Sequence, residues 1–199
     1  AGSSPCQDFS ACGKGTERDG VAGLTRSFAE IVAQLRPSLF LLENVPNIIH
    51  SAAYEWLCEH VAAAGYDYTV VTLNAKYAGT SQCRRRSFVC GVLGGARVKL
   101  TQLQNVLRAR QAEAKAGAPV TVRATLGDRC GDAVYFAARN KFHPCVLSTD
   151  RVYPTLRSHR GKCVERPPRA YRPRYEDAAP VGVAHVLEPE DAALIASFP

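Results

Sequence analysis

Three short segments of the sequence carry side chains that could do chemistry. Cys6 stands in the stretch PCQ, ahead of a loop that contains Gly and Ser. Glu43 follows a short apolar run, and three more polar side chains precede a later apolar run: Gln82, Arg84 and Arg86. A thiolate is a strong nucleophile near neutral pH, so the first question is whether Cys6 is a nucleophile or a small apolar side chain in a core.

The elements expected around these side chains place them at strand ends. Apolar spacing and stop signals predict helices at 24–35, 51–65, 99–114 and 187–199, and strands at 39–42, 67–75 and 87–93. The continuous apolar run 39–42 is typical of a buried strand in a parallel sheet. This order predicts an α/β fold. Because ligands bind at the carboxyl ends of strands in open α/β sheets, the three segments are expected to meet in one cleft.

Each candidate also has an ordinary structural explanation when taken alone. A single Cys is often buried and inert, a Glu after a strand is often a cap or an ion-pair partner, and a run of arginines is often a solvated face. The order in which the three segments occur along the chain is what favours a functional site.

Composition narrows the class of protein. The eight cysteines include no CxxC pair, so neither a disulfide framework nor a metal site is predicted. No apolar run approaches the roughly 20 residues that span a bilayer, and no secretion signal opens the chain, so an intracellular protein without a membrane partner is expected. The net charge of +7 suits a polyanion. Basic and Tyr residues gather in 151–175, where Arg157 and Arg160 are predicted to face phosphates; a solvated linker is the alternative.

The combination of segments resembles the cytosine-C5 DNA methyltransferase family. Pro5, Cys6 and Gln7 match the family's nucleophile motif, and Glu43, Asn44 and Val45 match its acid motif. Two longer stretches add to the resemblance: LNAKYAGTSQCRRR at 73–86 and HVLEPEDAALIASFP at 185–199. The second of them departs from the family's usual residues at several positions: His185, Glu188, Glu190, Leu194 and Ala196.

The resemblance implies roles that agree with the chemistry of the residues. Cys6 would add to C6 of cytosine, and Glu43 would place a proton against N3 of the same ring. Arg86 would bridge the cytosine carbonyl and Glu43, Arg84 would contact a phosphate, and Asn44 would orient Glu43. Further substrate contacts are expected at Gln7, Ser10 and Gln82, the last of which is expected to fix its loop rather than touch the base.

The resemblance also implies a cofactor and a DNA substrate. S-adenosylmethionine is expected as the methyl donor, with contacts at Pro5 and Leu24. The target base of double-stranded DNA would be flipped out of the helix, and the loop 8–20 would close over it.

The expected fold is therefore α/β, with part of a Rossmann-like methyltransferase sheet, helices on both of its faces and a small irregular target-recognition region. Residues 1–95 are assigned to the catalytic half, 96–182 to target recognition and 183–199 to a return segment. The family's Gly-rich cofactor loop is not in the sequence, so a fragment or a split enzyme with a complementary N-terminal methyltransferase half is expected, in the cytoplasm or nucleus. Two alternatives stay open: an inactive DNA-binding remnant and a tRNA cytosine-C5 methyltransferase.

Overall fold

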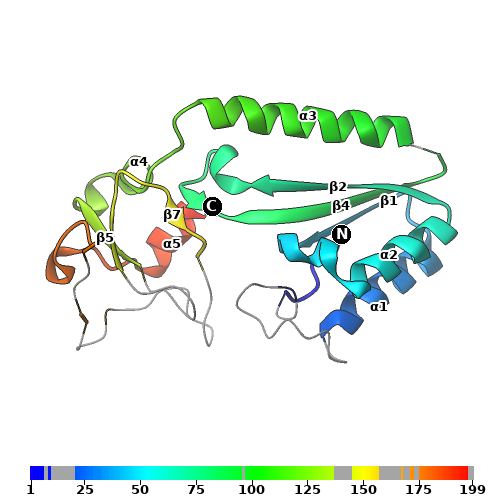
Figure 1. The fold of residues 1–199 in the computed structure, drawn as a ribbon, viewed down its shortest axis with the longest axis horizontal. Helices are drawn as coiled ribbons and strands as arrows, with labels where there is room; N and C mark the ends of the chain where they lie inside the picture. Colours follow the sequence, from blue (N-terminus) through cyan, green and yellow to red (C-terminus); the bar gives the residue numbers. More distant parts are fainter. Residues whose placement is uncertain are drawn as a thin grey trace. The chain divides into compact units, whose positions relative to one another are not determined.

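The computed structural model describes residues 1–6, 9, 21–95, 97–136, 145–156, 167, 171–172 and 175–196. The chain divides into two compact units (Figure 1). Unit 1 consists of 1–73 and 85–113, and unit 2 consists of 74–84 and 114–199. The α/β class expected from the sequence is confirmed, while the functional boundaries at 95 and 182 stay predictions.

Unit 1 is a small sheet with helices packed on it. The sheet has the strand order β1-β4-β2, and three α-helices accompany it. Their bounds are α1 Val21–Leu35, β1 Leu39–Asn44, α2 Ala52–Ala63, β2 Tyr66–Asn74, β4 Arg85–Leu93 and α3 Arg97–Ala116, with a 3-10 turn at Pro46–His50.

Local sequence explains where the helices of unit 1 begin and end. The hydroxyl of Ser51 accepts a hydrogen bond from the Tyr54 N–H and so caps the start of α2. Gly65 follows α2 with φ 89°, a left-handed conformation that residues other than Gly adopt at a cost. Pro37 stands just after α1, where its ring prevents the helix from continuing.

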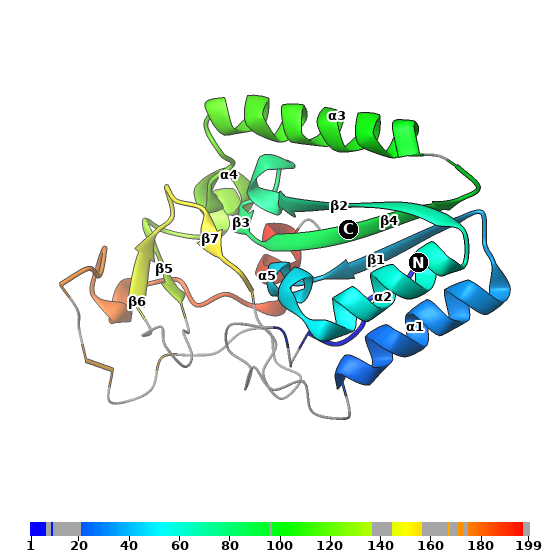
Figure 2. The same cartoon turned by 45° about the vertical axis from the view of Figure 1, so that its right-hand side comes forward.

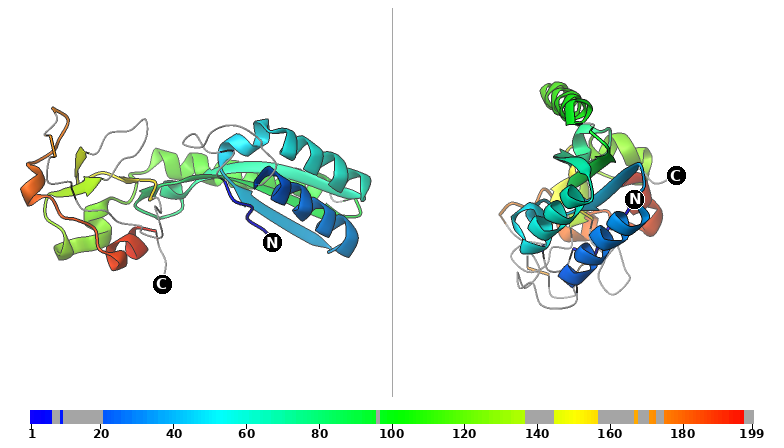
Figure 3. Two further views of the ribbon diagram at one scale, coloured as in Figure 1. Left: turned by 90° about the horizontal axis from the view of Figure 1, so that it is seen from below. Right: turned by 90° about the vertical axis from the view of Figure 1, so that its right-hand side faces the viewer.

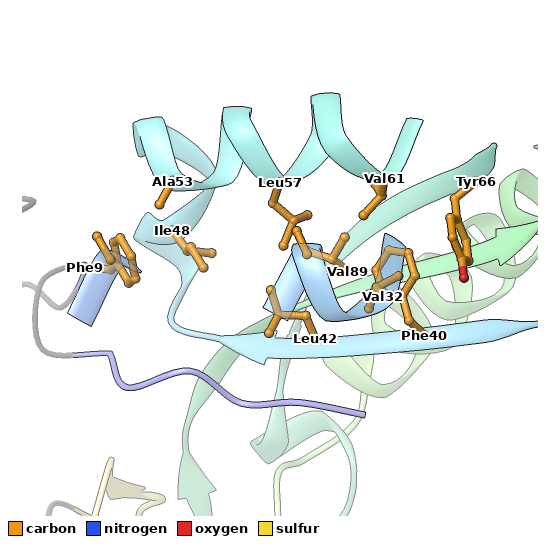
Figure 4. Packing of buried hydrophobic residues seen from close by; sticks show 12 residues of the cluster. Phe9, Val32, Phe40, Leu42, Ile48, Ala53, Leu57, Val61, Tyr66 and Val89 are labelled. Atoms are coloured by element: carbon orange, nitrogen blue, oxygen red, sulfur yellow. The ribbon is translucent and has the colours of Figure 1, made fainter. Parts of the chain in front are cut away.

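The core of unit 1 lies between the sheet and the pair α1 and α2. Figure 4 shows Leu57 and Val61 of α2 pointing at Leu42 and Phe40 of β1, and all four are buried. Gly91 of β4 lies against the Phe40 ring, where even a Cβ would overlap the aromatic carbons. The alternation of buried positions along β1 therefore fixes which face of the sheet the helices cover.

The third helix lies along the edge strand of the same sheet. In Figures 1 and 2, α3 runs beside β2. Gln104 Nε2 donates to the Val70 carbonyl at 2.7 Å, and Gln111 Nε2 donates to the Thr72 carbonyl at 3.5 Å. Two backbone carbonyls of β2 thus accept hydrogen bonds from side chains of α3.

Strand β1 has an antiparallel neighbour on one side and a parallel neighbour on the other. It pairs antiparallel with β4 in the register Leu42↔Val89, and it forms a parallel bridge with Gly2 on its other side. The expectation of a parallel strand was therefore only half right. The apolar run predicts burial on both sides of the strand, and an antiparallel neighbour provides that burial as well as a parallel one does.

Unit 2 is built from short elements. Strands β5 (Ala133–Phe136) and β6 (Cys145–Ser148) form an antiparallel pair, and β3 (Gln82–Cys83) pairs in parallel with β7 (Tyr153–Pro154). The described residues of unit 2 also form two short helices, α4 Val122–Leu126 and α5 Pro189–Ile195, and 3-10 turns at Ala75–Tyr77, Gly127–Arg129 and Val181–Val183. The views in Figure 3 show the same elements from two further directions.

A buried carboxylate anchors α5 within unit 2. The Asp191 side chain is 2% exposed, and it accepts hydrogen bonds from His185 Nε2 at 2.8 Å, Arg129 Nε at 2.9 Å and the Glu188 N–H at 3.0 Å. Burial alone would raise the pKa of Asp191, but these three donors outweigh it and hold the pKa below its usual value. His185, one of the positions that departs from the family's usual residues, is therefore one of the donors.

Candidate active site

The segment that carries Cys6 is attached to β1 by backbone hydrogen bonds. Gly2 N–H donates to the Leu41 carbonyl at 2.8 Å, and Glu43 N–H donates to the Gly2 carbonyl at 2.9 Å. Gly2 also packs against Phe28 of α1 so closely that a Cβ would overlap the ring. Residues 3–6 consequently run past the end of β1, where Glu43 and Asn44 lie.

Glu43 has one partner on each carboxylate oxygen, an ion pair on Oε1 and a hydrogen bond on Oε2. Arg86 Nε lies 2.7 Å from Oε1, and Ser3 Oγ donates to Oε2 at 2.7 Å. The Arg86 and Glu43 side chains are 17% and 27% exposed, so this ion pair is only partly open to water. Arg86 Nη1 donates instead to the Arg85 carbonyl at 2.7 Å. The expected contact between Arg86 and Glu43 is therefore present.

Asn44 faces the other way and holds the segment before Cys6. It is 2% exposed, and its Nδ2 donates to the Ser4 carbonyl at 3.0 Å and to Ser4 Oγ at 2.9 Å. Its Oδ1 accepts the Val45 N–H at 2.8 Å. Asn44 therefore binds Ser4 directly, whereas the resemblance implied that Asn44 would orient Glu43.

Cys6 follows this anchored segment directly. Its side chain is half-buried, and its carbonyl accepts the Phe9 N–H at 3.1 Å, which forms a turn. Phe9 is buried in the core of unit 1 and so fixes the far side of that turn. The Cys6 backbone is thus bound on both sides by contacts within unit 1.

Pro5 and Leu24, the two residues expected to contact a cofactor, each adjoin in sequence a residue of the hydrogen-bonded pair Ser4 and Thr25. Ser4 Oγ and Thr25 Oγ1 are 2.8 Å apart, and Thr25 is fully buried. Pro5 and Leu24 adjoin this pair in sequence; Pro5 is exposed and Leu24 is 49% exposed. Both side chains are therefore apolar and accessible, and their contact with a cofactor stays a prediction.

Gln82 and Arg84 belong to unit 2 and are held there. Gln82 is 3% exposed, and its Oε1 accepts the Leu156 N–H at 3.0 Å. Arg84 N–H donates to the Gln82 carbonyl at 3.1 Å, and the Arg84 carbonyl accepts the Ala75 N–H at 2.9 Å. These contacts agree with the expectation that Gln82 fixes its loop.

Several predicted site residues lie outside the described residues. These are Gln7, Ser10, Arg157 and Arg160, together with nearly all of the loop 8–20. Within the described ranges, no group of three or more His, Cys, Asp or Glu side chains is placed to hold a metal ion.

Ser3, Ser4 and Thr25 also take part in the site and were not predicted from the sequence. Two adjacent hydroxyl residues before PCQ were the available signal. Their partners depend on the pairing of Gly2 with Leu42, which sets Ser3 beside Glu43 and Ser4 beside Asn44. Side chains alternate between the two faces of a strand, so the two serines serve opposite faces.

Comparisons with known proteins identify the family. The family model of C-5 cytosine-specific DNA methylases matches residues 1–165, so this chain belongs to that family and the resemblance is confirmed. The type II methyltransferase M.HgiDI of Herpetosiphon aurantiacus is 34% identical over 200 residues, which cover 100% of this chain and 61% of the relative. M.HindV of Haemophilus influenzae is 34% identical over 202 residues, which cover 100% and 62%.

The chain therefore spans about three fifths of the length of these two relatives. Among solved structures, the Entamoeba histolytica methyltransferase EhMeth is similar with a TM-score of 0.41 and 18% identity, over 47% of this chain and 31% of that one. In the part of the chain that the structure describes, no helix is long and apolar enough to cross a membrane.

Proposed function

We propose that this chain provides the nucleophile and the acid of a DNA (cytosine-5)-methyltransferase. The observation that carries the proposal is the arrangement of Glu43 between Arg86 and Ser3, next to the anchored segment that ends in Cys6. We further infer that β1, β4 and β2 belong to a Rossmann-like methyltransferase sheet with helices on both faces. The functional division at 95 and 182, with target recognition between, belongs to the same proposal.

The chemistry needs C5 of cytosine to become nucleophilic. The Cys6 thiolate adds to C6 of the ring, and Glu43 gives a proton to N3, which accepts the displaced electron density. Arg86 pairs with Glu43, and we assign to it the contact with the cytosine carbonyl as well. A base must leave the duplex to meet these groups, so base flipping is part of the proposal.

S-adenosylmethionine, when bound, supplies an electrophilic methyl group. In this chain we assign contact with it to Pro5 and Leu24, which are both exposed and which adjoin in sequence the hydrogen-bonded residues Ser4 and Thr25. Once C5 carries the methyl group, water takes the C5 proton; the S–C6 bond then breaks, the N3 proton returns to Glu43, and the Cys6 thiolate and the aromatic ring are restored. We assign the DNA contacts outside the cleft to Arg84, Arg157 and Arg160, and base contacts to Gln7 and Ser10.

The proposed partner is double-stranded DNA, in the cytoplasm or nucleus. Since the relatives are longer than this chain, a complementary methyltransferase half is included among the proposed partners. Because the relatives are type II methyltransferases, we propose that this protein acts in a restriction-modification system.

A covalent trap tests the proposal. The full-length protein is incubated with S-adenosylmethionine and duplex DNA containing 5-fluorocytosine, which cannot lose a proton from C5. We expect an adduct that resists denaturation and that is absent in Cys6→Ser, since a hydroxyl is a weak nucleophile at its ordinary pKa. Adduct formation by Cys6→Ser would contradict the assignment. Trapping on tRNA but not on DNA would favour the tRNA enzyme, and no trapping on either would favour an inactive remnant.

A further inference from the structure

The hydroxyl of Ser3 is the second partner of the Glu43 carboxylate, after Arg86. The bridge between Gly2 and Leu42 places Ser3 next to Glu43, and Ser3 Oγ donates to Oε2 at 2.7 Å. Arg86 Nε lies 2.7 Å from Oε1 in an ion pair, and Arg86 Nη1 donates a hydrogen bond to the Arg85 carbonyl. An ion pair restrains the direction of a carboxylate less than a hydrogen bond does, so the Ser3 donor on the other oxygen is what limits rotation of the Glu43 carboxylate.

We propose that Ser3 is a positioning residue that orients Glu43 and makes Oε2 the oxygen that carries the transferred proton. This role rests on the proposed function. A guanidinium is always charged and has no acceptor, so a proton on Oε1 would face a positive group whose Nε is 2.7 Å away. A hydroxyl can accept as well as donate, so Ser3 can rotate its O–H away when Oε2 is protonated.

The step in which Ser3 would act is the addition to the base. The Cys6 thiolate forms an S–C6 bond, the C5–C6 π electrons shift toward N3, and the proton on Oε2 of Glu43 moves to N3. Without a methyl donor, C5 can take a proton from water and lose its original hydrogen. The S–C6 bond then breaks, the N3 proton returns to Glu43 and the thiolate is regenerated.

This reversible addition gives a readout that needs no methyl transfer. The full-length protein is mixed with mixed-sequence duplex DNA tritiated at C5 of cytosine, without a methyl donor, and release of tritium to water is followed. Three variants are compared with the unmodified protein: Ser3→Ala, Ser3→Thr and Ser38→Ala. Ser38 is an exposed serine just before β1, at the end remote from Glu43, and serves as the matched control.

We expect Ser3→Ala to release tritium about tenfold more slowly at saturating DNA, the size of effect typical for losing a hydrogen bond to a charged group. Its KM for DNA should stay within about twofold, because Ser3 contacts Glu43 and not the phosphates. Ser3→Thr keeps the hydroxyl and should recover the rate to within about threefold. Ser38→Ala should match the unmodified protein.

The outcomes separate this role from the proposed function. Ser3→Ala that exchanges at the unmodified rate, while Cys6→Ser does not exchange, overturns the role of Ser3 and leaves the function standing. Equal losses in Ser3→Ala and Ser3→Thr also overturn it, because a packing defect and not the hydroxyl would then explain them. If the unmodified protein releases no more tritium than Cys6→Ser, the proposed function itself is overturned, and the role of Ser3 with it.

Discussion

Asn44 donates from one side-chain nitrogen to both the carbonyl and the hydroxyl of Ser4, at 3.0 and 2.9 Å. The two residues are 40 positions apart in sequence, yet this contact determines how the chain approaches Cys6. Because Asn44 is buried, its polar atoms have no water to replace these partners.

Asn44→Ala should therefore lower the free energy of unfolding by about 1–3 kcal/mol, because the Ser4 and Val45 groups lose a buried partner. Urea denaturation followed by circular dichroism measures this change. Asn47→Ala is the matched control, since Asn47 is exposed on the turn Pro46–His50 and should be within about 0.5 kcal/mol of the unmodified protein. Equal stability of the two variants would contradict the anchoring role of Asn44.

Gly91→Ala should destabilise unit 1, because the new methyl group would overlap the Phe40 ring. Overpacking of this kind costs about 1–3 kcal/mol. Thermal unfolding is the measurement, and Gly182→Ala provides the control, since a Cβ at Gly182 meets nothing within 4 Å. The double variant Gly91→Ala with Phe40→Leu should recover part of the loss; no recovery would point to a cause other than the ring.

The stability of unit 2 should depend on pH through Asp191. Its pKa is lower in the folded protein than in the unfolded chain, so its stabilising contribution is fully present above the unfolded value of about 3.9. The contribution is lost as pH falls through the lower, folded pKa. Asp191→Asn should thus lower the melting temperature at pH 7, and the difference from the unmodified protein should shrink below about pH 4.

Asp128→Asn is the control for this experiment, because Asp128 is exposed one residue before Arg129. It should leave the melting temperature within about a degree at pH 7. A melting difference for Asp191→Asn that stays constant from pH 7 to pH 3 would show that its carboxylate charge is not the source of the stability.

Leu24→Asp should weaken binding of S-adenosylmethionine to the full-length protein with little change in stability, because Leu24 is 49% exposed and is the proposed cofactor contact on α1. Loss of one apolar contact predicts about a tenfold weaker Kd, which calorimetry can resolve. Ile31→Asp serves as the control, because Ile31 lies on the same helix and is 53% exposed. Equal affinities for the two variants would remove Leu24 from the cofactor site.

Replacing Arg157, Arg160 and Arg172 by Gln should reduce the salt dependence of DNA binding. Each lost phosphate contact should lower the slope of log K against log salt by about 0.9. Fluorescence anisotropy with duplex DNA between 50 and 200 mM salt measures it. Arg26→Gln on α1 is a matched exposed arginine outside this stretch and should leave the slope unchanged. An unchanged slope in the triple variant would support the solvated-linker alternative.

The regular part of unit 1 was predictable because its signals are local. Apolar spacing placed α1, α2 and α3 within three residues of their observed ends, and the strands β1, β2 and β4 were found within two. The short strands of unit 2 were not predicted. Their existence depends on pairings such as Val134↔Leu147, between segments that carry too few residues to show a period.

In the candidate active site too, some features could be predicted from the local sequence, and others depend on pairing between distant segments. Cys6 and Glu43 could be brought together from the rule that ligand sites lie at strand ends. The roles of Ser3 and Ser4 could not, because they follow from the register of Gly2 against β1, and a slip of one residue would exchange the faces on which the two hydroxyls lie. Asn44 was predicted to orient Glu43, but its observed partner is Ser4, which is set by that same register.

The glutamines of α3 have a consequence for the behaviour of the protein in solution. An edge strand with free carbonyls is a template on which another molecule can add a strand, and such addition is how many sheets begin to aggregate. Gln104 already donates to the Val70 carbonyl, and the helix that carries it occupies the space beside β2. An incoming strand would have to displace twenty residues of helix before it could pair there, so α3 protects this side of the sheet from self-association.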